Sequence, residues 1–138
     1  MKIAFLCTAN SARSQMSEGL ARSLSGSHIE VYSAGSKPAD KVNPYAVTVM
    51  KEIGIDISHH TPKGIEALPT DLDLLITVCS NAAEECPMLP GYEVIHWNLP
   101  DPASVDGDEE NKLTAFREIR DEIKRRTQIL LKELLQSV

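Results

Sequence analysis

The chain has 138 residues, and 14 Lys plus Arg against 20 Asp plus Glu give it a formal net charge of −6. This length predicts a single domain, residues 1–138, and the acidic balance argues against DNA or an anionic membrane surface as partners. A local anion site remains compatible with this charge, because helix N-termini bind anions through backbone dipoles. Apolar residues make up 42% of the sequence, which indicates a folded core.

No targeting or membrane segment is visible. The N-terminal apolar run covers only residues 3–7, which is shorter than a signal peptide or a membrane helix requires. We therefore expect a cytoplasmic protein. The three cysteines are Cys7, Cys79 and Cys86, and an odd number in a cytoplasmic chain indicates catalysis, metal binding or core packing rather than a disulfide framework.

Apolar runs typical of buried strands alternate with helical periodicity along the chain. In chain order we expect a strand at 3–7, a helix at 12–25, a strand at 29–33, a helix at 44–54, strands at 72–79 and 94–97, and a helix at 113–134. Met16, Leu20 and Leu24 define the apolar face of the first helix. This order predicts βαβ crossovers and an α/β fold whose mainly parallel sheet has helices on both faces.

Three loops follow the C-terminal ends of the predicted strands, at 7–14, 79–90 and 98–108. Parallel α/β folds bind their ligands at this edge of the sheet. All three cysteines fall at these loops. We call residues 7–14 the cysteine loop.

The cysteine loop combines a nucleophile with the elements of an anion site. Its sequence, CTANSARS, places five residues between Cys7 and Arg13, which lets the chain curl with its backbone N–H groups inward. The following helix adds the positive end of its dipole, and Arg13 can hold an oxyanion through two hydrogen bonds. The same positive field favours the thiolate of Cys7, to which the Ser14 hydroxyl can donate. Asn10 tolerates the left-handed conformation that such a curl requires.

The loop therefore predicts attack by Cys7 on a bound oxyanion. The candidate binding residues are Thr8, Ala9, Asn10, Ser11, Ala12, Arg13 and Ser14. The alternative is that Cys7 is a small buried residue at the end of a strand and Arg13 is a surface residue of the helix. The position of the motif between a buried strand and a helix start favours the anion site.

The motif Cys7-x5-Arg13-Ser14, close to the N-terminus of a short α/β chain, resembles the low-molecular-weight protein tyrosine phosphatase superfamily. That superfamily includes thioredoxin-coupled arsenate reductases, and the likeness covers essentially the whole chain. The resemblance implies a three-layer fold with a four-stranded parallel sheet. It also implies a general acid on a later Asp-Pro loop.

Residues 98–108, which we call the acid loop, contain Pro100-Asp101-Pro102 after the fourth predicted strand. The two prolines stiffen the backbone around one carboxylate. By resemblance, Asp101 protonates the leaving oxygen while Cys7 attacks. The alternative is that Asp-Pro simply begins a turn.

The resemblance gives the other two cysteines a role that a phosphatase does not need. The arsenate reductases of the superfamily carry a pair like Cys79 and Cys86, followed by proline. The implied relay begins with Cys7 on arsenate, continues with Cys79 on the sulfur of Cys7, and ends with a Cys79–Cys86 disulfide that thioredoxin reduces. If residues 79–86 were helical, the two Cα atoms would lie about 10 Å apart. A disulfide needs roughly 4.4–6.8 Å, so we expect an order change there on oxidation.

Other interpretations of the pair remain open at this stage. Cys79 could be core, and Cys86 could lie on a helix face. Zinc is a further alternative, with His96 or the pair His59-His60, but Cys-x6-Cys is wider than the usual spacing of structural zinc sites. We predict no metal site, and the sequence assigns the histidines no catalytic role.

Departures from the phosphatases favour a small inorganic oxyanion as substrate. Phosphatases usually continue the motif with proline, where this chain has Gln15. Their acid loop carries aromatic residues that grip an aryl ring, whereas residues 103–105 are Ala-Ser-Val here. Phe5, Trp97 and Phe116 fit the core, so no clamp for phosphotyrosine is evident.

Some members of the superfamily bind potassium near the loop. Asn10, Glu18 and Ser33 stand at matching positions, but Lys63 occupies the place of the acidic residue. An ammonium group there could replace the cation, so we expect no potassium and no other cofactor.

The sequence thus predicts an arsenate reductase that uses Cys7, Cys79 and Cys86 with Arg13 and Asp101. We expect arsenate as substrate, phosphate or sulfate as competing anions, thioredoxin as the external reductant and a monomer. The first alternative is a low-molecular-weight tyrosine phosphatase with accessory cysteines. The second is a redox sensor without enzymatic activity, whose cysteine pair switches a partner surface.

Overall fold

The computed structural model describes residues 1–79 and 93–136. Its strands and helices are β1 (Lys2–Cys7), α1 (Arg13–Ser25), β2 (Glu30–Gly35), α2 (Pro44–Glu52), β3 (Leu74–Thr77), β4 (Glu93–His96) and α3 (Glu109–Gln136). The structure also contains two short 3-10 helices, η1 (Ile65–Ala67) and η2 (Pro102–Ser104), among the described residues. All seven predicted elements are confirmed, with ends that differ by a few residues.

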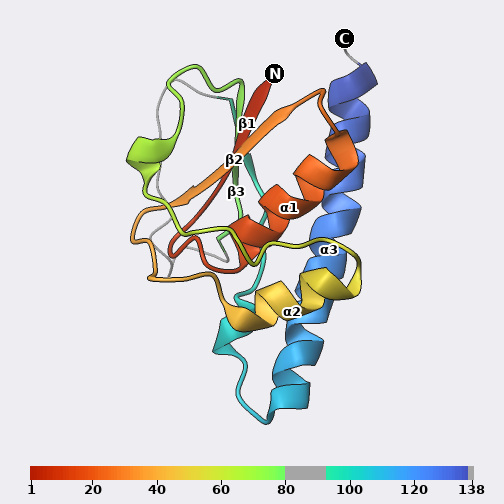
Figure 1. Cartoon of the computed structure of the whole chain (residues 1–138). Helices are drawn as coiled ribbons and strands as arrows, with labels where there is room; N and C mark the ends of the chain where they lie inside the picture. The colour runs from red at the N-terminus through yellow and green to blue at the C-terminus, as the bar shows by residue number, and fades with distance from the viewer. Residues whose placement is uncertain (80–92, 137–138) are drawn as a thin grey trace.

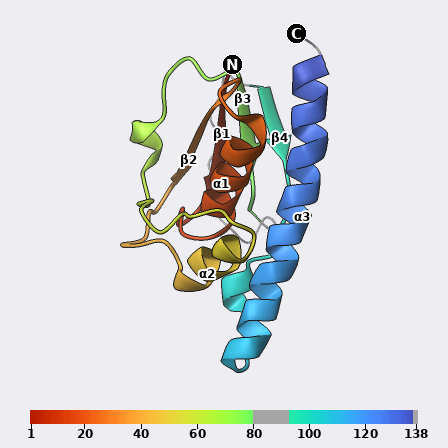
Figure 2. The same cartoon turned by 45° about the vertical axis from the view of Figure 1, so that its right-hand side comes forward.

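The four strands form one parallel sheet in the order β2-β1-β3-β4, which confirms the predicted α/β fold. Cys7 is in register with Gly35 on one side of β1, and Leu6 is in register with Thr77 on the other. The chain therefore leaves β1 and β3 at the same edge of the sheet. Figures 1 and 2 show this edge near α2, with the N-terminus at the opposite end.

The central strand β1 is buried on both faces. Ile3, Phe5 and Cys7 face the main core, to which α1, α2 and α3 all contribute. Ala4 and Leu6 face a smaller core on the other side, against which residues of the η1 region pack. Both views show α1 and α3 side by side on the main-core face (Figures 1 and 2). The predicted core aromatics Phe5, Trp97 and Phe116 are all buried.

The predicted apolar face of α1 is correct only for its first part. Met16 and Leu20 are buried, whereas Leu24 is 41% exposed and corrects the prediction. Residues 13–21 are all buried and residues 22–24 are exposed, so burial here depends on position along the helix more than on its face. Residues 22–24 lie at the surface, whereas Ser25 at the end of α1 is buried again.

Helix α2 is joined to the cysteine loop at its start. Asn43 caps the helix by accepting from Tyr45 N–H at 2.9 Å, and Pro44 occupies a first-turn position that suits proline. The N–H of Asn43 donates to the carbonyl of Ser11 at 2.7 Å. At the other end, Arg120 of α3 donates to the carbonyl of Val49 and to Glu52. Helix α3 thus anchors α2, and α2 anchors the cysteine loop.

In the part of the chain that the structure describes, none of the helices combines the length and the apolar character needed to span a bilayer.

Gly35 permits the close approach of β2 to the cysteine loop. A Cβ atom at this position would lie 2.5 Å from the carbonyl oxygen of Thr8 and 2.9 Å from the backbone nitrogen of Asn10. We expect Gly35→Ala to lower the free energy of unfolding by about 1–3 kcal/mol, because rigid backbone would have to move. Urea unfolding measures this change.

Gly64→Ala is the matched control. Gly64 has an extended backbone with φ −80°, and the nearest atoms to a Cβ there would be those at the flexible end of Glu66. We expect this control to stay within about 0.5 kcal/mol of wild type. Equal losses in both variants would contradict the proposed role of the close approach.

Candidate active site

The cysteine loop is held from outside by the segment that follows β2. The N–H groups of this segment donate to the carbonyls of the cysteine loop: Ser36 to Cys7 at 3.3 Å, Lys37 to Thr8 at 2.8 Å, Ala39 to Ala9 at 2.9 Å and Asn43 to Ser11 at 2.7 Å. The described chain has no cis peptide bond, and in a trans peptide the carbonyl and the next N–H point in opposite directions. Each outward carbonyl therefore turns the following N–H toward the inside of the loop.

Cys7 lies at the base of this curl as a free, buried thiol, 3% exposed. Its sulfur accepts from the N–H of Asn10 at 3.0 Å and lies 2.9 Å from the Ser14 hydroxyl. Asn10 adopts the left-handed conformation, with φ +51°, which the sequence predicted it could tolerate. The sulfur thus has one backbone N–H and one hydroxyl within hydrogen-bond distance.

Helix α1 completes the curl. It begins at Arg13, and its N-cap residue Ala12 has no side-chain oxygen that could cap the first turn. N–H groups of an uncapped first turn are the donors that bind oxyanions at helix starts. The buried Arg13 guanidinium donates through Nη1 to the carbonyl of Leu99 at 2.8 Å. Arg13 thus ties the cysteine loop to the acid loop.

The direction of the hydrogen bonds around Asn10 follows from one backbone donor. Lys63 N–H donates to Asn10 Oδ1 at 2.9 Å, so the other amide atom of Asn10 is the NH2 group. This group donates to the hydroxyls of Ser14 at 2.7 Å and Ser33 at 3.0 Å. Ser14 accepts from Asn10 with one lone pair, which leaves its own proton available for the Cys7 sulfur.

Glu18 is a buried carboxylate behind the loop, 3% exposed. It accepts from the Ser33 hydroxyl at 2.8 Å. Its cationic neighbours are Arg22 at 3.2 Å and Lys63 at 3.7 Å, with the ring of His60 at 3.4 Å. The Lys63 ammonium therefore lies beside the carboxylate, as expected from its place in the sequence.

Gln15 and His60 belong to the same network, and the sequence analysis missed both. Gln15 is fully buried, and its amide nitrogen donates to the carbonyl of Thr61 at 3.1 Å. The same nitrogen also lies 3.0 Å from Asn10 Oδ1 and 3.2 Å from the Asn10 carbonyl oxygen, and since it carries two N–H groups, one of them is shared between two of the three acceptors. Its amide oxygen lies 3.0 Å from His60 Nδ1. The only available signal was that Gln15 occupies the position of a proline in phosphatases.

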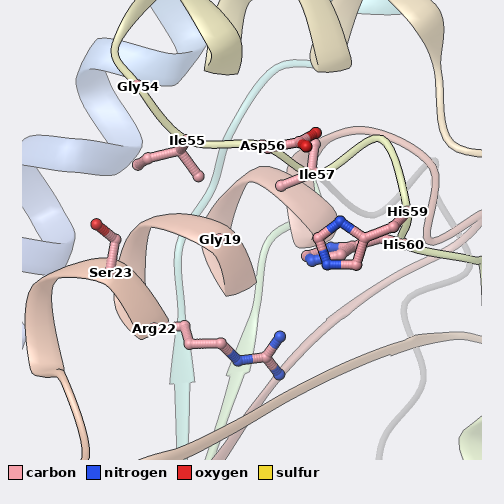
Figure 3. A pocket seen from close by; sticks show the side chains of 9 residues that line it. All are labelled: Gly19, Arg22, Ser23, Gly54, Ile55, Asp56, Ile57, His59 and His60. Carbon is pink, nitrogen blue, oxygen red and sulfur yellow. The ribbon is translucent and has the colours of Figure 1, made fainter.

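A pocket of about 290 Å³ lies on the outer side of His60 (Figure 3). Helix α1 contributes Gly19, Arg22 and Ser23 to its lining, and the chain at 54–60 contributes the rest. His60 therefore lines this pocket and also contacts Gln15 of the interior network. Burial lowers the pKa of His60 below its ordinary value, although the neighbouring Glu18 carboxylate opposes the change.

The acid loop follows β4, and Cys79 follows the neighbouring strand β3. Asp101 is the N-cap of η2, and its carboxylate accepts from the N–H of Ala103 at 3.0 Å. The Arg13–Leu99 hydrogen bond places this loop against the cysteine loop only two residues before Asp101. The role of Asp101 as general acid stays a prediction.

Cys79 follows β3 by two residues and is buried in the main core. It is disulfide-bonded, whereas Cys7 is a free thiol. Cys86 lies outside the described residues, and so does the predicted order change at 79–86. On the neighbouring strand, His96 lies 2.6 Å from the Thr77 hydroxyl through Nδ1.

Residues 1–79 and 93–136 contain no group of three or more His, Cys, Asp or Glu side chains placed to hold a metal ion.

The model of the family described as low molecular weight phosphotyrosine protein phosphatase matches residues 2–138. The chain belongs to this family. It is 49% identical over 126 residues to an arsenate reductase of Halalkalibacterium halodurans, with 90% of each chain covered. It is 48% identical over 123 residues to an arsenate reductase of Bacillus subtilis, with 88% of each chain covered.

Solved structures of this family show the same fold. An arsenate reductase in its phosphate-binding state superposes with a TM-score of 0.79 at 34% identity, covering 96% of this chain and 97% of that chain. A thioredoxin-dependent arsenate reductase of Corynebacterium glutamicum superposes with a TM-score of 0.75 at 31% identity, covering 99% of this chain and 63% of that chain.

The lowered pKa of His60 predicts how this family member loses stability in acid. In the unfolded chain His60 takes up a proton at a higher pH than in the native state, so the native state loses stability as pH falls below about 6.5. We expect His60→Gln to show a smaller decrease in unfolding free energy between about pH 7.5 and about pH 5.5 than wild type shows. Urea unfolding at each pH measures this difference.

His59→Gln is the matched control, because His59 is the exposed neighbour of His60. It should keep most of the wild-type decrease, because burial is the largest cause of the lowered pKa of His60 and His59 is a smaller one. The same decrease in His60→Gln and wild type would refute the assignment.

Proposed function

We propose that this protein is an arsenate reductase that works through a relay of three cysteines and is regenerated by thioredoxin. The proposal rests on one observation. Cys7, at the end of β1, is a free thiol, whereas Cys79, just after the neighbouring strand β3, is disulfide-bonded. A phosphatase needs the first cysteine only. The identities of 49% and 48% to arsenate reductases support the same reaction.

The first step is formation of a bond between Cys7 and arsenic. The inward N–H groups of the cysteine loop and the Arg13 guanidinium bind the arsenate oxygens. The Cys7 thiolate, held by Asn10 and Ser14, attacks arsenic. One arsenate oxygen leaves as water, with a proton from Asp101.

The second step is the reduction. The Cys79 thiolate attacks the sulfur of Cys7, and the electron pair of the sulfur–arsenic bond stays on arsenic, which leaves as arsenite. Cys86 then attacks Cys79, which releases Cys7 as a thiolate. A thioredoxin dithiol reduces the Cys79–Cys86 disulfide and is itself oxidised. The free Cys7 and disulfide-bonded Cys79 of the structure correspond to the state before thioredoxin acts.

The relay also fits one chain in the cytoplasm. All three cysteines belong to the same polypeptide, so a monomer suffices. Turnover must return them to thiols, and the cytoplasm keeps thiols reduced. Phosphate and sulfate share the tetrahedral shape of arsenate, so they compete for the cysteine loop.

The test is arsenate-dependent oxidation of NADPH in the presence of thioredoxin and thioredoxin reductase. Wild type should turn over, and Cys7→Ser, Cys79→Ser and Cys86→Ser should each lose at least about a thousandfold in steady-state rate. Cys86→Ser should still release at most one arsenite per enzyme. Asp101→Asn should lower kcat by about a hundredfold or more, because it cannot donate the proton.

Asp106→Asn is the matched control for Asp101→Asn, since both carboxylates lie in the acid loop, and it should keep wild-type turnover. The family also contains phosphotyrosine phosphatases, and the cysteine loop is common to both activities. Hydrolysis of an aryl phosphate that needs Cys7 but neither Cys79 nor Cys86, without arsenate turnover, would assign this chain to the phosphatases instead. Absence of both activities would favour the redox sensor.

We further propose that turnover needs no potassium. Arg22 and Lys63 already place positive charge beside the buried Glu18 carboxylate, within 3.2 Å and 3.7 Å. Replacing potassium by sodium should leave kcat and KM of wild type unchanged. Lys63→Asp should lower the rate in sodium and recover at least about twofold in potassium, because a bound cation then has two carboxylates.

Lys132→Asp applies the same charge change on the exposed surface of α3 and should show no difference between the two salts. A potassium requirement in wild type would contradict the proposal.

A further inference from the structure

Gln15 lies between the cysteine loop and the chain at 60–63, and its orientation is fixed by a backbone group. The carbonyl of Thr61 can only accept, so the atom of Gln15 that lies 3.1 Å from it is the amide nitrogen. The amide oxygen therefore faces His60 Nδ1 at 3.0 Å. Because that oxygen only accepts, His60 carries a proton on Nδ1.

With this orientation, Gln15 holds Asn10 at two points. Its amide N–H groups reach the side-chain oxygen of Asn10 at 3.0 Å and the backbone oxygen of Asn10 at 3.2 Å. Side chain and backbone of one residue are thus fixed relative to each other. A left-handed conformation is strained for a residue with a Cβ atom, so it persists only where the surroundings impose it.

The conformation of Asn10 decides what reaches the nucleophile. The Asn10 N–H points at the Cys7 sulfur at 3.0 Å only because the backbone turns at φ +51°. Its side chain also orients the Ser14 hydroxyl, the other group at that sulfur. If Asn10 left this conformation, its N–H would no longer reach the Cys7 sulfur. The Ser14 hydroxyl would also lose the group that orients it.

We propose that Gln15 is a positioning residue that holds Asn10 in the left-handed conformation, and that His60 fixes Gln15 from the pocket side. The hydrogen bonds of Gln15 reach Asn10, Thr61 and His60, and none of those described reaches the Cys7 sulfur. It acts through Asn10 on oxyanion binding and on the reactivity of Cys7. The inference goes beyond the proposed function, because it concerns the shape of the loop whether the enzyme reduces arsenate or hydrolyses a phosphate ester.

The test is a double-mutant cycle in the full chain with Cys79 and Cys86 replaced by serine, so that Cys7 is the single thiol. The variants are Gln15→Met, which keeps the length of the side chain without its amide, Asn10→Gly, and the two together. Glycine adopts positive φ without strain, so it removes the need for a clamp. The measurements are the Kd for inorganic phosphate and the alkylation rate of Cys7 by iodoacetamide as a function of pH.

We expect Gln15→Met alone to weaken phosphate binding by about fivefold or more and to move the alkylation profile of Cys7 to higher pH. In the Asn10→Gly background the same change should cost less than about twofold. The control Gln128→Met makes the identical change on the exposed surface of α3 and should alter neither measurement.

Equal factors for Gln15→Met with and without Asn10→Gly would overturn the proposal, since the effect would not pass through Asn10. A Gln15→Met protein that behaves like Gln128→Met would overturn it as well. If Gln15→Met does not fold, His60→Ala and its exposed control His59→Ala replace it in the cycle. His60→Ala should then weaken phosphate binding by about twofold or more in the Asn10 protein only, and equal effects in both backgrounds would refute the proposal.

Discussion

Every polar group of Asn10 is hydrogen-bonded, and the candidate active site depends on this one residue. Its N–H reaches the Cys7 sulfur, its amide NH2 group reaches Ser14 and Ser33, and its oxygens accept from Gln15 and Lys63. These bonds join the nucleophile, helix α1, strand β2 and the chain at 60–63. They hold a buried residue in a strained conformation, which persists only where the surroundings impose it.

The charge distribution explains how an acidic protein can bind an anion. Two nearby cations, Arg22 and Lys63, are directed to the buried carboxylate of Glu18. Attraction for an oxyanion therefore comes from Arg13 and from backbone N–H groups, whose directions are set by outward carbonyls. Backbone dipoles act over short range, so the site needs no positive surface around it.

Local patterns in the sequence were sufficient to predict the strands, the helices and the cysteine loop. Apolar runs and helical periodicity located the seven strands and helices of residues 1–79 and 93–136, because each pattern depends on neighbours in the chain. The exposure of Leu24 was not predictable in this way, since it depends on where the packing around α1 ends. The pair Cys79 and Cys86 gained a role only by resemblance, and Cys86 lies outside the described residues.

The contacts of Gln15, His60 and Glu18 could not be predicted from the sequence, for a related reason. Gln15 and His60 are 45 residues apart, and their contact exists only because the chain at 60–63 returns to the start of α1. Glu18 is spaced like a surface residue of an amphipathic helix, yet its three basic neighbours come from α1 and from that returning segment. Burial of such a carboxylate is a property of the assembled fold, not of the helix that carries it.

The hydrogen bond from Arg13 to the Leu99 carbonyl gives substrate binding a mechanical consequence. A guanidinium has a planar fork of donors, so one edge can keep the carbonyl while another meets an oxyanion. In the proposed mechanism, the side chain that binds the oxyanion is therefore also hydrogen-bonded to the loop that carries Asp101. The single ammonium group of a lysine could not make both contacts in one plane.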